Sequence, residues 1–158
     1  MSTRKLSAGI LLYRFNDAVL EVLLAHPGGP FWVRKDEGAW SIPKGEFREG
    51  EDPLENAIRE FEEETGTKLR GKFIQLAPLR QKSGKIIHAF AHEGDLDPAK
   101  ITSNTFELEW PPRSGKKIKV PEIDRVEWFS PDMSRKKINP GQEDFIRQLL
   151  LLLSEHKL

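Results

Sequence analysis

The feature that most constrains this chain is an acidic segment with clear helix-start and helix-stop signals. Asp52 is suited to cap a helix N-terminus, and Pro53 fits the first helical position. Glu55 completes a capping box with Asp52, and Gly66 supplies a C-terminal stop. The sequence therefore predicts a helix over residues 52–65.

This helix is expected to have two different faces. One is an apolar, core-facing stripe formed by Leu54, Ala57, Ile58 and Phe61. At about 100° per residue, Glu60, Glu63 and Glu64 share a separate face, where Glu60 and Glu64 repel each other by a few tenths of a kcal/mol. A divalent cation such as Mg²⁺ would offset that repulsion, whereas the alternative is an ordinary solvated acidic face. We also expect Arg59 to reach Glu62 or Glu63.

The remaining elements interleave strands with helices. Strands are predicted at 6–14, 18–25, 73–79, 85–92, 105–110 and 123–129, and a second helix at 141–155. Residues 26–52 form an irregular stretch, long enough to indicate a functional loop. Residues 111–122 are expected to form a basic loop bounded by prolines. This order predicts an α/β fold with a mixed sheet.

Composition excludes several classes of protein. The 158 residues include 25 basic and 25 acidic side chains and no cysteine, so we expect one domain over 1–158, without disulfides or a thiol nucleophile. Zero net charge argues against binding long nucleic acid but allows a small phosphorylated ligand. The longest apolar run, Leu149–Leu153, is far below the roughly 18 residues of a membrane span. We expect no membrane partner, a cytoplasmic location, and either a monomer or a homodimer joined through these leucines.

The acidic helix and the loop before it resemble the signature of the Nudix hydrolases. Its seven invariant positions are matched at every required spacing by Gly45, Glu51, Arg59, Glu60, Glu63, Glu64 and Gly66. A chance match in a chain of this length is on the order of one in a million. Phe61 and Thr67 depart from the usual aliphatic residues, which affects packing only.

The resemblance implies an α/β/α sandwich and a site for Mg²⁺ or Mn²⁺. The implied metal ligands are Glu60, Glu63 and Glu64, one of which could act as a base. Gly45 would allow a close backbone approach at the metal site. Arg59 would orient the carboxylates, and Glu51 would hold the loop to the helix.

Two residues outside this signature are further candidates. Glu122 precedes the strand 123–129, the position from which some Nudix enzymes add a carboxylate ligand; the alternative is an exposed loop glutamate. Lys44 directly precedes Gly45 in a Pro-Lys-Gly turn, and we interpret it as a phosphate contact.

A basic stretch could serve the distal phosphates of a substrate. It contains Arg113, Lys116, Lys117 and Lys119, with no acidic residue among them. A solvated loop is the alternative. Trp110 is a candidate for stacking on a base, with Phe31 and Trp32 as rivals.

These residues predict a Mg²⁺-dependent pyrophosphohydrolase in which water attacks phosphorus directly, since no covalent nucleophile stands out. The segment Trp40–Glu46, which leads into this signature, resembles the corresponding segment of enzymes acting on nucleoside triphosphates and dinucleoside polyphosphates. A diphosphoinositol polyphosphate is an alternative substrate. A Nudix-fold module that binds a nucleotide without cutting it is the alternative function.

Overall fold

The first hairpin forms the centre of the sheet. Strand β1 (Leu6–Asn16) has seven consecutive buried residues, which indicates that both of its faces are covered. It pairs with β2 (Val19–Pro27) through a two-residue turn in which Asp17 and Ala18 both have positive φ, as in a type I′ hairpin turn. The predicted hairpin is confirmed, one residue beyond its expected turn.

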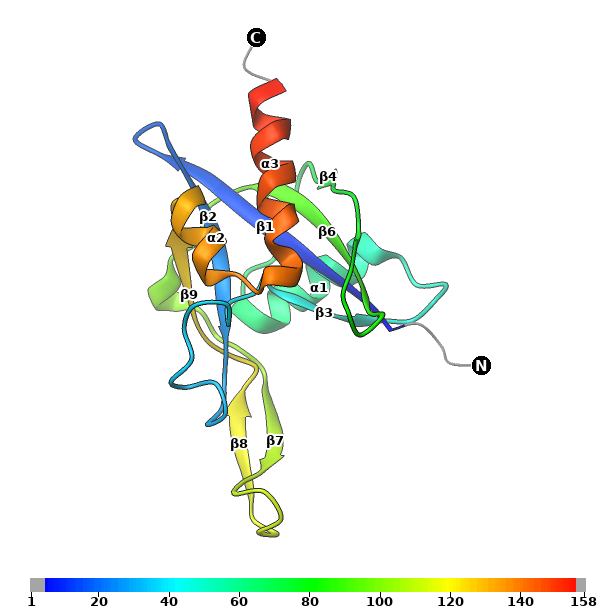
Figure 1. Ribbon diagram of the computed structural model, residues 1–158, viewed down its shortest axis with the longest axis vertical. Helices are drawn as coiled ribbons and strands as arrows, with labels where there is room; N and C mark the ends of the chain where they lie inside the picture. Colours follow the sequence, from blue (N-terminus) through cyan, green and yellow to red (C-terminus); the bar gives the residue numbers. More distant parts are fainter. Residues whose placement is uncertain (1–4, 156–158) are drawn as a thin grey trace.

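The computed structural model describes residues 5–155 and contains a seven-stranded mixed sheet (Figure 1). Its main strand order is β4-β6-β1-β2-β9, with β3 paired to β1 and β5 to β6. The further strands are β3 (Lys44–Phe47), β4 (Ile74–Gln75), β5 (Leu79–Arg80), β6 (Ile86–Glu93) and β9 (Ile123–Phe129). Only β6 runs parallel to its neighbour β1, and the other pairs are antiparallel.

Helices cover both faces of this sheet, which confirms the expected α/β/α sandwich. Helix α1 (Pro53–Thr65) packs Ala57 and Phe61 against one face. On the other face lie α2 (Pro131–Lys137), the short 3₁₀ turn η2 (Pro140–Gln142) and α3 (Glu143–Glu155). Figure 1 shows α2 and α3 in front of the sheet and α1 behind it.

The ends of α1 follow from its capping residues. The Asp52 carboxylate accepts a hydrogen bond from the Glu55 backbone N–H at 2.9 Å, and Gly66 closes the helix at φ 83°. The helix begins at Pro53, one residue after the expected start, because Asp52 is its cap. Helix α3 begins at Glu143 rather than at 141, because Pro140–Gln142 form a 3₁₀ turn.

Three sequence-based expectations about strands and loops were wrong. The strand predicted at 73–79 is split into β4 and β5, with Pro78, which cannot donate to a ladder, between them. The irregular stretch 26–52 contains β3. The loop expected at 111–122 contains strand β8 (Lys117–Pro121), which pairs with β7 (Thr105–Glu109). Its alternating Ile118 and Val120 lie opposite apolar residues of β7.

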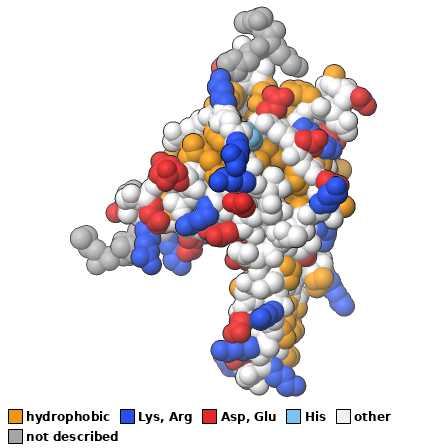
Figure 2. All heavy atoms as spheres, turned by 180° about the vertical axis from the view of Figure 1, so that it is seen from behind, with side chains coloured by type: hydrophobic (Ala, Val, Ile, Leu, Met, Phe, Trp, Pro, Cys, Tyr) orange, Lys and Arg blue, Asp and Glu red, His pale blue; other side chains and the backbone are white. Residues whose placement is uncertain are grey.

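The β7–β8 hairpin projects from the body of the molecule (Figure 1). Viewed from behind, its far end has several basic side chains (Figure 2). The 3₁₀ turn η1 (Pro98–Lys100) lies between β6 and this hairpin in the sequence. Within residues 5–155, no helix is long and apolar enough to cross a membrane.

Candidate active site

Gly45 lies directly beneath the carboxylate of Glu60. Strand β3 places Gly45 opposite Ala8 of β1, with the backbone close to α1. A Cβ atom at Gly45 would lie 2.1 Å from Glu60 Cδ and 2.3 Å from its Oε2. No side chain fits at that distance, so a glycine is required for Glu60 to lie where it does.

Glu64 is the most strongly perturbed group of the site. Its side chain is buried, and it accepts a hydrogen bond from the backbone N–H of Lys44. Burial, together with the charges of Glu122 and Glu60, raises the pKa of Glu64 to about 9. Its Oε2 atom has no hydrogen-bond partner among the described residues. A buried carboxylate oxygen without a partner is costly, and a cation is the kind of partner that would satisfy it.

Glu122 is held beside α1 by a chain of backbone hydrogen bonds. The Asn104 N–H donates to the Glu63 carbonyl at 2.9 Å, and the Glu122 N–H donates to the Asn104 carbonyl at 2.8 Å. Burial and the Glu63 charge raise the pKa of Glu122. A cavity of about 170 Å³ beside it is lined by Lys44, Glu64 and Glu122. The structure therefore brings the expected later carboxylate to the acidic face of α1.

The acidic residues also raise one another's pKa. Burial and the neighbouring charge of Glu63 raise the pKa of Glu60, an effect that Arg59 partly offsets. No three His, Asp or Glu side chains within residues 5–155 already meet as a metal-binding group. The carboxylates are thus close enough to repel but not arranged as a finished ligand cage. The unpartnered Glu64 oxygen and the Gly45–Glu60 contact nonetheless fit a divalent cation.

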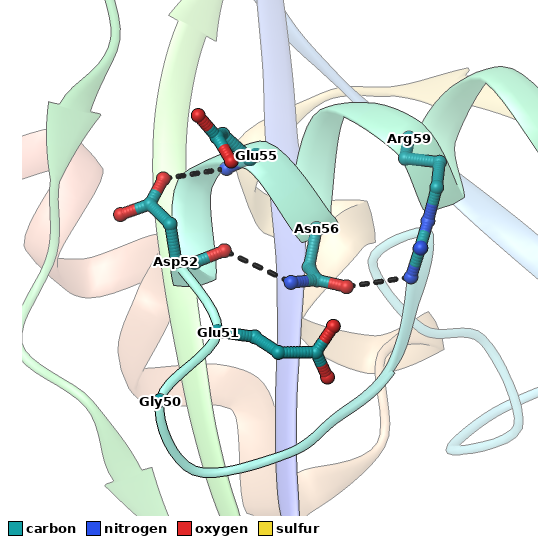
Figure 3. A pocket seen from close by; sticks show the side chains of 6 residues that line it. All are labelled: Gly50, Glu51, Asp52, Glu55, Asn56 and Arg59. Atoms are coloured by element: carbon teal, nitrogen blue, oxygen red, sulfur yellow. Dashed lines mark hydrogen bonds between the residues drawn. The ribbon is translucent and has the colours of Figure 1, made fainter.

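Arg59 and Glu51 stabilise the loop and the first turns of α1 (Figure 3). Arg59 Nη2 donates to Asn56 Oδ1 at 2.5 Å and lies 3.6 Å from Glu60 Oε1. The expectation that Arg59 reaches Glu62 or Glu63 is not met, because its guanidinium turns towards Asn56 and Glu60 instead. Glu51 Oε1 accepts from the Arg48 N–H at 2.8 Å and so closes its own loop.

This loop also borders an open cavity of about 460 Å³. Its lining consists of Gly50, Glu51, Asp52, Glu55, Asn56 and Arg59 (Figure 3). Three of these six residues are acidic, and the lining includes none of the three glutamates on the other face of α1. We therefore place the candidate chemistry at Glu60, Glu64 and Glu122 rather than in this larger cavity.

Lys44 is close to the acidic residues and has an unexpected neighbour. Burial, and next the charge of Lys85, lower the pKa of Lys44, while Glu64 and Glu46 act in the opposite direction. Sequence reasoning missed Lys85, because it follows the ordinary Ser83-Gly84 turn and belongs to no recognised motif.

The predicted substrate-binding residues of the hairpin are not brought to the carboxylates. Trp110, Arg113 and Lys116 lie at the tip, between β7 and β8, whereas Glu122 lies at the base. Lys117 and Glu122 are five positions apart, which corresponds to roughly 16 Å of extended strand. Their role in binding substrate stays a prediction.

Comparison with known proteins identifies the family. The model of the NUDIX domain matches residues 3–149, so the chain belongs to the Nudix family. Nudix hydrolase 6 of Arabidopsis thaliana is 38% identical over 74 residues, which are 46% of this chain and 24% of that protein. An octanoyltransferase of Myxococcus xanthus is 33% identical over 91 residues, 58% of this chain and 22% of that protein. The matches thus span about a quarter of these relatives.

Solved structures share the fold. The NUDIX domain of Shewanella oneidensis NrtR, complexed with ADP ribose, aligns with a TM-score of 0.67 and 17% identity, covering 97% of this chain and 90% of that one. An Ap4A hydrolase of C. elegans, in a binary complex, gives 0.65 and 18%, covering 94% and 98%. These likenesses confirm the Nudix sandwich.

Proposed function

We propose that this chain is a Mg²⁺-dependent pyrophosphohydrolase that cleaves a phosphoanhydride bond in a nucleoside triphosphate or a dinucleoside polyphosphate. The observation that carries the proposal is the convergence of Glu122 on the acidic face of α1, where the buried Glu64 has an unpartnered oxygen. Such a group of carboxylates suits a hard divalent cation and, through it, a phosphate chain.

Each residue has a distinct role in this proposal. Glu60, Glu63, Glu64 and Glu122 would hold the cation, which when bound would neutralise phosphate charge and lower the pKa of the attacking water. Gly45 would allow Glu60 to lie against β3, and Arg59 would hold Glu60 from the other side. Lys44 would contact a phosphate oxygen.

The proposed reaction is a direct displacement at phosphorus. The water oxygen forms a bond to phosphorus as the bridging P–O bond breaks, and the leaving phosphate takes the bonding electron pair. One of the four carboxylates accepts the proton from the water. No covalent intermediate with the chain is needed.

The experiment that tests the function is product analysis by ion-exchange chromatography. The substrates are diadenosine tetraphosphate, the NTPs and dNTPs, ADP-ribose, nucleotide sugars and a diphosphoinositol polyphosphate, each with MgCl₂ and with EDTA. We expect Mg²⁺-dependent cleavage of diadenosine tetraphosphate or of a triphosphate. Nucleotide binding without cleavage of any substrate would instead indicate a binding module.

Substituting Gly45 with alanine should impair the site without unfolding the chain. The added methyl group would displace the Glu60 carboxylate, from which its Cβ would be only 2.1 Å away. A displacement of about 1 Å is expected to lower kcat/KM by roughly 100-fold. Activity assays and Mn²⁺ titrations measure the effect.

Gly115→Ala is the matched control for this substitution. It introduces the same methyl group at positive φ with no atom within 4 Å, at the hairpin tip and away from the carboxylates. We expect it to cost some stability and little activity. Equal activity of the two variants would contradict the role assigned to Gly45.

A further inference from the structure

Strand β3 presents different chemistry on its two faces. Successive residues of a strand point to opposite faces, and Gly45 faces Glu60 of α1. Lys44 and Glu46 therefore share the other face, opposite Gly9 and Ser7 of β1. Gly9 leaves room for Lys44, because a Cβ at Gly9 would lie 2.7 Å from Lys44 Cβ.

Lys85 adds a second positive charge to this face. Its ammonium group lies 3.8 Å from Glu46 Oε1, and its positive charge lowers the pKa of Lys44. Only 21% of the Lys85 side chain is exposed, whereas the Glu46 side chain is 64% exposed. The Glu46 carboxylate is thus largely in water, where its charge is screened, while the Lys85 side chain is mostly covered and Lys44 is half-buried.

Two adjacent and partly buried ammonium groups repel each other, and an anion bound between them would offset this repulsion. The same face also has a buried hydroxyl, Ser7 Oγ, without a hydrogen-bond partner among the described residues. Lys44 and Glu64 line one cavity, and their charges act on each other. Lys44 therefore adjoins the proposed cation site, while Lys85 lies beside Glu46 on the face of β3 that Lys44 shares.

We propose that Lys85, together with Lys44, binds a phosphate beyond the two joined by the cleaved bond. This inference rests on the proposed function and narrows its substrate to chains of three or more phosphates. Lys85 takes the role that sequence reasoning gave to Arg113 and Lys116, which the structure places at the hairpin tip. Substrates with only two phosphates, such as ADP-ribose or nucleotide sugars, would not reach Lys85.

The test compares binding of two non-hydrolysable probes by titration calorimetry in MgCl₂: β,γ-methylene-ATP and α,β-methylene-ADP. Lys85→Gln should weaken binding of the triphosphate probe by roughly tenfold and that of the diphosphate probe by less than about twofold. Lys85→Arg, which keeps the positive charge, should retain most of the affinity for the triphosphate probe. Lys82→Gln, an exposed lysine in the same turn, should change neither.

Kinetics provide a second readout. For a cleaved triphosphate or dinucleoside polyphosphate, Lys85→Gln should raise KM by roughly tenfold and leave kcat within about threefold.

Equal effects on both probes, no effect on either, or no binding of the triphosphate probe by the unsubstituted protein would overturn the inference. Selective loss of triphosphate binding in a protein that cleaves nothing would support Lys85 and refute the proposed hydrolysis. Hydrolysis that Lys85→Gln leaves unchanged would support the proposed function and refute the role of Lys85.

Discussion

Glu64→Gln should lower kcat/KM for phosphoanhydride hydrolysis by roughly 1,000-fold, equivalent to about 4 kcal/mol of lost transition-state stabilisation. Glutamine has nearly the same shape but no negative charge, so it would be a poor ligand for a divalent cation. Glu64 is the carboxylate for which this matters most, because it is buried and its Oε2 has no partner in the described part of the chain. Steady-state kinetics at several Mg²⁺ concentrations measure the loss.

Glu62→Gln is the matched control. Glu62 is exposed and lies on the same helix, two residues from Glu64, so the substitution makes the same change in net charge. We expect near-normal activity and an unchanged circular dichroism spectrum. If both variants kept comparable activity, Glu64 would not belong to the catalytic machinery.

Local signals in the sequence were sufficient for α1 and its acidic face. The cap at Asp52, the stop at Gly66 and the spacing of the glutamates each depend on neighbouring residues, and the structure agrees with the helix that they predict. The central hairpin was predictable for the same reason, since its turn and its strands are contiguous. Membership of the Nudix family followed from the complete signature and is confirmed.

Contacts between segments that are distant in the sequence were harder to predict from the sequence. Position relative to the strand 123–129 pointed to Glu122 but not to the hydrogen bonds through Asn104 that bring it to α1. Lys85 is 41 residues from Lys44 in the sequence, and only the pairing of β1 with both β3 and β6 brings them together. Charge is visible in a sequence and indicated a phosphate site at the basic stretch 113–119, whereas the position of this stretch on a projecting hairpin is visible only in the structure; its role in binding substrate stays a prediction.

In EDTA, without a bound cation, the free energy of unfolding of the protein should fall as the pH rises from 5 to 8. The pKa of Glu64 is raised from 4.5 to about 9 by burial and by neighbouring carboxylates. Across this window the Glu64 carboxyl is largely ionised in the unfolded chain but protonated in the folded protein, so folding becomes less favourable with increasing pH. The raised pKa values of Glu60 and Glu122 act in the same direction. The lowered pKa of His88, which burial causes, acts in the opposite direction near pH 6.5.

Glu64→Gln isolates the contribution of this carboxyl group. Over three pH units, the difference in unfolding free energy between the variant and the unsubstituted protein should change by up to about 4 kcal/mol in favour of the variant. Urea titrations in EDTA at pH 5, 6, 7 and 8 measure this difference. Saturating Mg²⁺ should flatten the pH dependence of the unsubstituted protein, because a cation that binds the ionised carboxylates stabilises only the folded state. A pH-independent difference in EDTA would show that Glu64 is ionised in the folded protein without a cation, which contradicts the burial and mutual repulsion on which the proposed site depends.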